Sequence, residues 1–278
     1  MSIDQRSAAF LAEMGIAPLW TLRGVAEEAA PAEAAPVDAA PEIVAAPVVA
    51  ARVNPDTPPM TSHVGPATDS AWGEEPPAPP ATEEEIAVMD WAQLKTAIAN
   101  CTRCGLCKGG RKPVHGSGAQ RASWFVAAGA TTAADEKERK PLAGEPGKLL
   151  VNMLAAVDLS REESVYVSNL IKCRPATPTG GDRVPTADEV AACKPYLERE
   201  LVLTGAPMVL TLGQIAANAL QGKPLQEALA GSRGQVHEVN GVSLVATLHP
   251  GELLRRGADK ALAWADLCLA RAHDGRGD

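Results

Sequence analysis

Four of the six cysteines have a spacing that suggests chemistry. Cys101 and Cys104 form a Cys-x2-Cys pair, Cys173 ends a predicted strand, and Cys193 lies in the predicted helix that follows. Four thiolates from two sequence regions can enclose one [4Fe-4S] cluster. A zinc site uses the same donors, and unliganded buried cysteines are a third alternative. Spacing alone leaves these three readings open.

The other two cysteines lie outside this set. Cys107 could compete as a ligand, but we interpret it as a packed or spare thiol, and Cys268 lies in the apolar stretch "WADLCLARA", which favours a core position. A signal peptide would show a basic segment before an apolar run, and the sequence has no such pattern. Because disulfide frameworks are typical of secreted proteins, we expect the cysteines to serve metal binding or redox chemistry instead. We expect the protein to be cytoplasmic.

Three further segments that could form a site come at the ends of predicted strands. They are the loop after Ala128, Asn169 near the end of "SVYVSNLI", and the "HPG" that begins at His249. Ligands of open α/β sheets bind at the carboxyl ends of the strands. The sequence therefore predicts that these segments meet at one edge of a sheet.

The elements that position these residues alternate between strand and helix patterns. Thr82 with Glu85, and Thr186 with Glu189, are capping-box signals for helices over "IAVMDWAQLKTAIAN" and "ADEVAACKPYLERELVL". Residues 240–241, Asn-Gly, predict a hairpin turn. The pattern predicts an α/β fold with three layers, α/β/α, around a central, mostly parallel sheet.

Composition divides the chain into three parts. Residues 25–87 hold twelve Asp or Glu against the single Arg52, although the whole chain has a formal charge of only −8. That stretch is rich in Ala and Pro and poor in large apolar residues, which predicts disorder, and Pro and Glu interrupt every apolar run that could span a membrane. We expect an apolar anchor peptide at 1–24, a disordered acidic linker at 25–82, and a folded domain at 83–278.

Four blocks of the folded part recur together in a known family. "CTRCGLC", "YVSNLIKCRPATPTGGDRVPTADEVAACKPYLERELVL", "PMVLTLGQIAANALQG" and "TLHPGELLRR" resemble the iron-sulfur, or family 4, uracil-DNA glycosylases over about residues 90–273. The resemblance implies that the [4Fe-4S] ligands are Cys101, Cys104, Cys173 and Cys193. It also implies a uracil-DNA glycosylase-like fold that flips uracil out of DNA.

The resemblance assigns catalytic roles to two residues. Asn169 matches the side chain that reads the hydrogen-bonding edge of the base, and His249 matches the residue that stabilises negative charge on the departing uracil. The structural alternatives are a strand-end turn for Asn169 and a helix cap or a core histidine for His249.

The first catalytic motif departs from the family pattern. The family has Gly-Glu-Ala-Pro-Gly, whose acid positions the attacking water, where this chain has "AAGATT" at residues 127–132. Ala128 or Gly129 takes the position of the acid in the base pocket, and Leu142 replaces the aromatic ring that stacks on uracil. Asp135 and Glu136 match a downstream acidic pair. We expect slow excision or none.

Basic residues near the proposed pocket could contact phosphates. Lys112, Arg121, Arg255 and Arg256 lie on predicted loops around the strand ends, and the alternative is a solvated basic face. We expect DNA, single-stranded or containing uracil, to be the main partner.

The N-terminal peptide has a weaker resemblance of its own. "MGIAPLWTLRG" is similar to the N-terminal peptide of the psi accessory subunit of the bacterial DNA polymerase III clamp loader. This implies a clamp-loader contact through residues 10–24, with Ile16, Leu19, Trp20 and Leu22 as the anchor. The alternative is that the peptide packs on its own domain. Two functions therefore stand, a divergent glycosylase and a non-catalytic adaptor.

Overall fold

The computed structural model describes residues 80–107 and 112–275. The expectations for the anchor peptide, including Ile16, Leu19, Trp20 and Leu22, and for nearly all of the linker lie outside these residues. No helix in the described ranges is long and apolar enough to cross a membrane.

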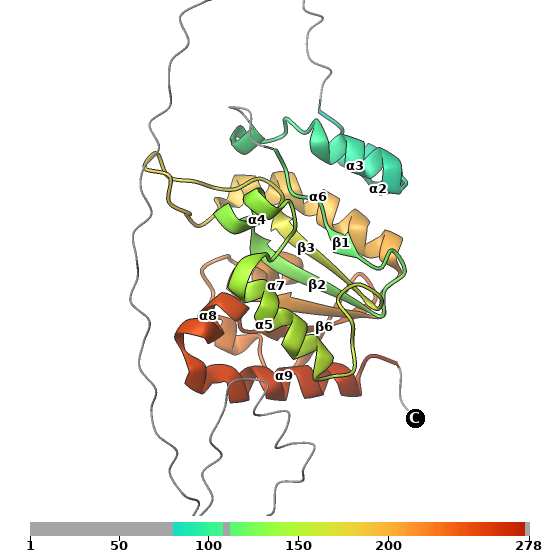
Figure 1. The fold of residues 1–278 in the computed structure, drawn as a ribbon. Coiled ribbons are helices and arrows are strands. Elements are labelled where there is room, and N and C mark those ends of the chain that lie inside the picture. Colours follow the sequence, from blue (N-terminus) through green and yellow to red (C-terminus); the bar gives the residue numbers. More distant parts are fainter. Residues whose placement is uncertain (1–79, 108–111, 276–278) are drawn as a thin grey trace, which may run out of the picture. The chain divides into compact units, whose positions relative to one another are not determined.

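A six-stranded sheet forms the centre of the described part (Figure 1). The strand order is β1-β3-β2-β4-β6-β5, in which β3, β2, β4 and β6 are parallel and the two edge strands are antiparallel to their neighbours. The strands are β1 (Ser117–Gly118), β2 (Trp124–Ala130), β3 (Val165–Ile171), β4 (Met208–Leu212), β5 (Val236–Val239) and β6 (Val242–Thr247).

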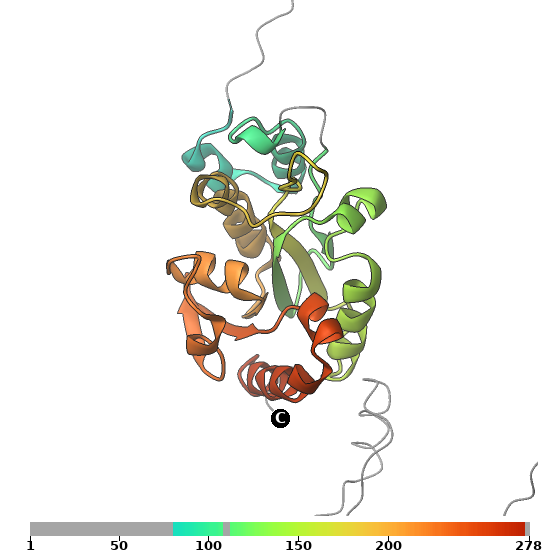
Figure 2. The same cartoon turned by 90° about the vertical axis from the view of Figure 1, so that its left-hand side faces the viewer.

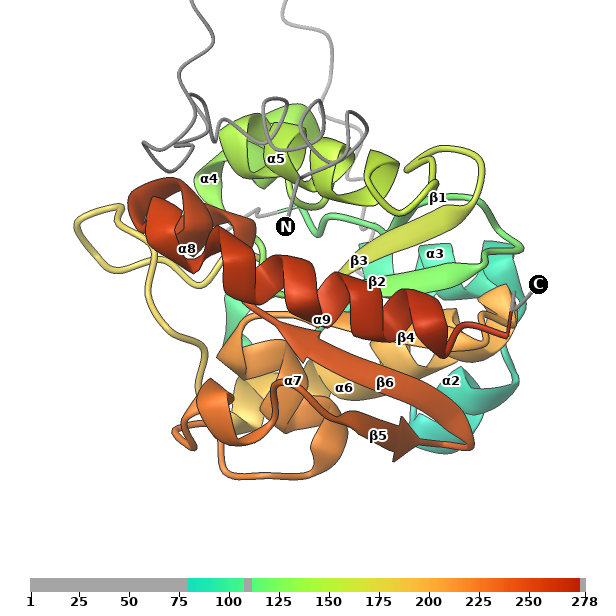
Figure 3. The same ribbon diagram turned by 90° about the horizontal axis from the view of Figure 1, so that it is seen from below.

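Helices cover both faces of the sheet. They are α2 (Glu83–Val88), α3 (Trp91–Ala99), α4 (Ala133–Glu138), α5 (Gly144–Ala155), α6 (Ala187–Thr204), α7 (Gln214–Gln221), α8 (Pro250–Arg255) and α9 (Lys260–Ala272). Short 3-10 turns lie at Gly105–Cys107, Leu229–Gly231 and Gly257–Asp259. Helices α5 and α9 lie on one face, nearest the viewer in Figure 3, and α6 lies on the other. The predicted three-layer α/β/α class is confirmed.

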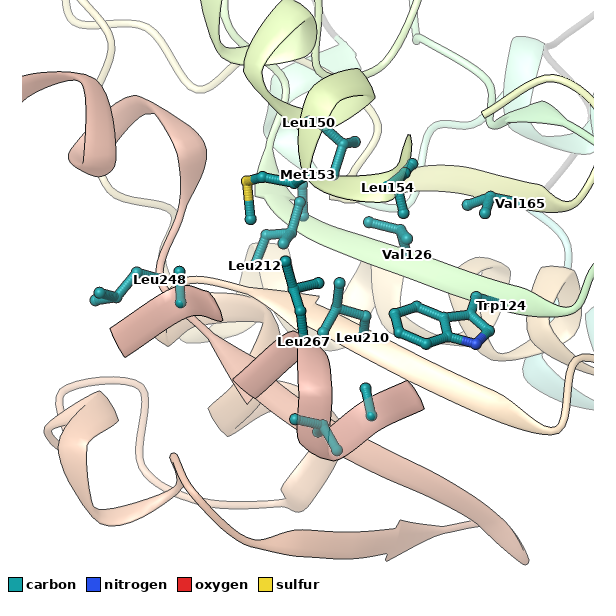
Figure 4. Packing of buried hydrophobic residues seen from close by; sticks show 14 of the residues in the cluster. Trp124, Val126, Leu150, Met153, Leu154, Val165, Leu210, Leu212, Leu248 and Leu267 are labelled. Carbon is teal, nitrogen blue, oxygen red and sulfur yellow. The ribbon is translucent and has the colours of Figure 1, made fainter. Parts of the chain in front are cut away.

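The alternation of side chains along β2 explains the layers. Trp124, Val126 and Ala128 join the core cluster that includes α5 and α9, whereas Phe125 and Ala127 join the cluster that includes α6. Figure 4 shows the first cluster, with Leu150 and Met153 of α5 and Leu267 of α9 packed around the strands. A strand buried on both faces reads as a continuous apolar run because successive side chains point to opposite sides.

Local signals placed several elements correctly. The capping boxes at Thr82 and Thr186 are formed. Asn240 and Gly241 both have positive φ, 53° and 78°, between β5 and β6, as a tight hairpin turn requires.

The first predicted helix is two helices in the structure. Helix α2 ends at Val88 and α3 begins at Trp91, because Asp90 caps a new helix with its own capping box to Gln93. The backbone at Met89 is extended, which turns the chain between the two helices.

Candidate functional site

A cleft of about 810 Å³ lies at the carboxyl ends of β2, β4 and β6. Most of its lining comes from four segments: residues 129–132 at the end of β2, residues 212–215 from the end of β4 to the start of α7, the region of α8 from His249 to Arg255, and residues 182–187 at the start of α6. Pro146 of α5 and residues 225–226 complete it. Figures 1 and 2 show α4, α8 and the loop before α6 gathered on this side of the sheet. The cleft has the size of a small-ligand site and the position expected for one.

His249 lines the cleft and caps α8. Its Nδ1 accepts a hydrogen bond from the Gly251 backbone N–H at 3.0 Å, so the neutral ring carries its proton on Nε2. Burial is the main cause that lowers the pKa of His249, and the positive charge of Arg255 also lowers it. The negative charges of Glu252 and Asp135 raise this pKa, but they do not outweigh burial. The cleft thus contains a neutral imidazole that can donate from Nε2.

Close packing fixes the position of His249. Gly213, which follows β4 and caps α7, has φ +83°, and a Cβ built there would lie 3.2 Å from Cβ of His249. A side chain at position 213 would therefore be strained and would also push the imidazole away.

Asn169 lies behind the cleft and does not line it. It is fully buried on β3, where its Cα pairs in register with Ala128. Its Nδ2 donates to Oγ1 of Thr131 at 3.1 Å and to Oδ2 of Asp135 at 3.0 Å, and its Oδ1 has no hydrogen-bond partner among the described residues. Thr131 does line the cleft, so Asn169 is one hydrogen bond away from it.

Asp135, which the sequence matched only to a downstream acidic pair, makes a contact with Asn169 that sequence reasoning missed. It is buried at the third position of α4, where it forms a capping box with Thr132 and also accepts a hydrogen bond from the Ala143 N–H at 2.7 Å. The Thr-x-x-Asp pattern could have predicted the helix cap. The contact with Asn169, 34 residues away, has no local signal.

The three proposed base-pocket residues have different environments. Gly129 lines the cleft, and a Cβ there would meet Cβ of Ile215 at 3.4 Å, an ordinary contact. Ala128 and Leu142 are buried in the core cluster below the sheet, and Leu142 has φ +49°. The structure therefore brings together Gly129 and His249, while Ala128 and Leu142 do not line the cleft.

Three of the four predicted ligand cysteines line one small cavity, and the fourth, Cys104, forms a hydrogen bond with one of them. This cavity is lined by Cys101, Cys173 and Cys193, and a hydrogen bond with Cys104, followed by burial, raises the pKa of the Cys193 thiol. Within residues 80–107 and 112–275, no group of three or more His, Cys, Asp or Glu side chains is arranged to hold a single metal ion. An iron-sulfur cluster instead takes one thiolate on each of several irons. Three thiols at one cavity, with Cys104 hydrogen-bonded to one of them, are the donors that such a cluster would need.

The proposed DNA-binding residues are spread over the surface. Arg255 lines the cleft, Arg256 pairs with Asp259 at 2.9 Å on the surface, and Lys112 is exposed. Arg121 differs from the expectation, because it precedes β2 and lines a separate cavity with Gly205, at the opposite end of the strands.

Comparison with known proteins agrees with this geometry. The model of the uracil DNA glycosylase superfamily matches residues 115–268. The type-4 uracil-DNA glycosylase of Pyrobaculum aerophilum is 30% identical over 195 residues, 65% of this chain and 93% of that protein. Those of Archaeoglobus fulgidus and Thermotoga maritima are 34% and 27% identical, over 57% and 64% of this chain and 80% and 88% of their own lengths. The chain belongs to the uracil DNA glycosylase superfamily, and the three relatives compared above are type-4 uracil-DNA glycosylases.

Proposed function

We propose that this protein is an iron-sulfur, type-4-like member of the superfamily that binds uracil in DNA and excises it very slowly. One observation carries the proposal: the cleft keeps the neutral donor His249, and of Ala128 and Gly129, the two candidates for the position of the family's acid, only Gly129 lines it and neither has a carboxylate. The names of the relatives supply the substrate class.

The expected reaction is hydrolysis of the N-glycosidic bond. Water adds at C1′ of the deoxyribose, the bond from C1′ to N1 breaks, and uracil leaves as an anion that takes up a proton. His249 would stabilise that anion by donating a hydrogen bond from Nε2. Without an acid to orient and deprotonate the water, we expect the rate to fall by about 10² to 10⁴.

Two carboxylates do line the cleft, and only one is available to replace the acid. Asp182 forms an ion pair with Arg174. The side chain of Glu252 makes no hydrogen bond or ion pair to any residue in the described ranges, although its charge acts on His249. Any slow excision would therefore depend on Glu252 or on unassisted water.

The cluster would be held by Cys101, Cys104, Cys173 and Cys193, and its contribution would be structural. It would tie the loop after α3 to the end of β3 and to α6. Through β3 it would support the strand that carries Asn169.

A non-catalytic adaptor is the second candidate, and the same observation favours it. Residues 129–132 carry no ionisable side chain, and Leu142 packs in the core, where it cannot stack on a base in the cleft. On this proposal the glycosylase-like domain binds DNA in the cytoplasm while residues 10–24 hold the clamp loader.

Single-turnover excision assays separate the two candidates. We expect the wild type to release uracil slowly from single- and double-stranded oligonucleotides, and His249→Ala to abolish that release. Glu252→Gln tests whether the remaining carboxylate contributes. If wild type and His249→Ala give the same background, the adaptor function stands. Fast wild-type turnover would overturn the proposal of slow excision.

A further inference from the structure

The chain has two tyrosines, and one of them lines the cavity of the cysteines. Tyr196 of α6 is 1% exposed and shares the lining of this cavity with Cys101, Cys173 and Cys193. Tyr166 of β3 is also buried, but it does not line the cavity. A buried tyrosine hydroxyl usually has a hydrogen-bond partner. The partner of the Tyr196 hydroxyl therefore indicates what this side chain does.

That partner is Cys101. Burial, and then a hydrogen bond with Cys101, raises the pKa of the Tyr196 hydroxyl, so the phenol keeps its proton. A cysteine binds a metal as a thiolate, which has no hydrogen and can only accept. If Cys101 is a cluster ligand, the phenol must therefore be the donor of this hydrogen bond.

Packing holds the ring of Tyr196 beside the cavity. The ring belongs to a core cluster with Ile86 of α2 and with Leu94 and Ile98 of α3, and Cys101 packs against the same cluster. Ile98 lines the cavity as well. The ring therefore has little freedom to turn away from Cys101.

The other polar side chain at the cavity has different partners. Lys172 lines the cavity, but its ammonium donates to Oγ of Ser168, to the backbone oxygen of Asn169 and to Oε2 of Glu200. These three bonds use all of its hydrogens. The ammonium of Lys172 is therefore not available to a cysteine sulfur, whereas the hydroxyl of Tyr196 is bonded to one.

Cys101 belongs to the more open half of the proposed ligand set. Cys101 and Cys104 are partly exposed, whereas Cys173 and Cys193 are buried. Hydrogen bonds to the sulfurs and exposure to solvent both influence the reduction potential of an iron-sulfur cluster. A donor at Cys101 therefore acts on a ligand that is less protected from water than Cys173 and Cys193.

We propose that Tyr196 is a positioning residue for the iron-sulfur cluster, whose hydroxyl bonds to the Cys101 sulfur, stabilises the reduced form of the cluster and slows its loss. Reduction adds one electron, and a hydrogen-bond donor at a thiolate stabilises the added negative charge. The inference rests on the cluster of the proposed function. It assigns no electron-transfer partner to the protein.

The reduction potential of Tyr196→Phe tests this directly. The protein is the anaerobically purified full chain, and an electrode supplies the electron. We expect a lower midpoint potential than in the wild type, by about a tenfold change in the equilibrium, which is about 59 mV for one electron. Iron should also be lost to a chelator about fivefold faster, as removal of one hydrogen bond implies. An unchanged potential would overturn the inference.

Tyr166→Phe is the matched control. It removes a second buried hydroxyl, which donates to Oε1 of Glu200 at 3.4 Å and lies outside the cavity. This variant should keep the wild-type potential and rate of iron loss, even where its thermal stability falls. Equal shifts of the potential in the two variants would show that Tyr196 has no specific role.

A stronger donor should have the opposite effect. In Tyr166→Phe, Tyr196 is the one tyrosine left, so growth on a fluorinated tyrosine labels position 196 alone. Fluorine makes the phenol more acidic and a better donor, and the potential should rise above that of unlabelled Tyr166→Phe. A potential that stays the same or falls would contradict the inference. This experiment retains the side chain, so it holds if Tyr196→Phe does not fold.

The iron content separates this inference from the cluster proposal. If the wild type contains no iron, the proposed cluster fails and the inference fails with it. If the wild type contains iron, but Tyr196→Phe has the wild-type potential and rate of iron loss, only the role of Tyr196 fails.

Discussion

Nζ of Lys172 lies 2.6 Å from Oε2 of Glu200, and both side chains are 2% exposed. The same ammonium donates to Oγ of Ser168 and to the backbone oxygen of Asn169, so its three hydrogens are all bonded. Lys172 follows β3 and Glu200 lies on α6. The pair therefore links the end of β3, between Asn169 and Cys173, to the helix of Cys193.

Removing one member of this pair should be strongly destabilising. Lys172→Met leaves the Glu200 carboxylate buried without its cation, and we expect it to lower the free energy of unfolding by about 3–5 kcal/mol. Lys194→Met is the matched control, because Lys194 pairs with Glu198 at 3.6 Å on the surface of α6, and should cost less than about 0.5 kcal/mol. Urea denaturation of the two variants measures both. Equal losses would show that the buried pair has no special role.

The position of Gly129 predicts a gain of function. Gly129→Glu places a carboxylate in the cleft at an ordinary contact distance from Ile215, so the domain should stay folded. We expect uracil excision to rise, by up to about 10² to 10⁴ if the new acid orients water. Gly129→Gln is the control for shape without charge. An increase that appears equally in Gly129→Gln would exclude an acid role.

The neighbouring position should respond in the opposite way. Ala128→Glu buries a carboxylate in the apolar cluster below the sheet and should prevent folding or lower stability severely. Leu142→Phe, which the family pattern suggests as a restored stacking ring, would enlarge a core side chain at positive φ and should destabilise without helping excision. Circular dichroism melts of both variants check these expectations.

Much of the fold, but less of the site, could be predicted from local sequence. Thr186 with Glu189 and the Asn240-Gly241 turn act on neighbouring residues, so their patterns predict structure directly. The burial of Leu142 and the contact between Asp135 and Asn169 depend on how distant segments pack. No local pattern distinguishes a residue in the cleft from one just beneath it.

The state of His249 predicts how stability changes with pH. Burial lowers its pKa below the ordinary value of 6.5, so the unfolded chain binds a proton more readily than the folded one. Its contribution to stability is therefore complete above about pH 6.5 and is lost as the pH falls through the folded pKa. His249→Asn keeps a side-chain acceptor for the cap and removes the titration. As the pH is lowered from about 8 to about 5.5, the denaturation midpoint should therefore fall less in this variant than in the wild type. Parallel curves would assign the acid sensitivity to other groups.

The cluster proposal predicts a visible cofactor. Anaerobically purified protein should be brown, and Cys173→Ala or Cys193→Ala should lose both iron and thermal stability, because binding of the cluster is coupled to folding. Cys268 lies on α9 and is exposed, so the core position expected from its apolar stretch was wrong. Cys268→Ala is therefore the control and should keep its colour. Stoichiometric zinc without iron would contradict the proposal.

The position of Arg255 predicts how DNA binding depends on salt. Arg255 lines the cleft, so if it neutralises a phosphate, Arg255→Ala should weaken binding to single-stranded DNA and reduce the slope of log affinity against log salt by about 1. Arg121→Ala removes the same charge at the opposite end of the strands and should leave the slope unchanged. Because both variants lower the net charge equally, a difference between them isolates the local contact from the overall field. Equal slopes for the two would show that the basic residue at the cleft does not contact the DNA backbone.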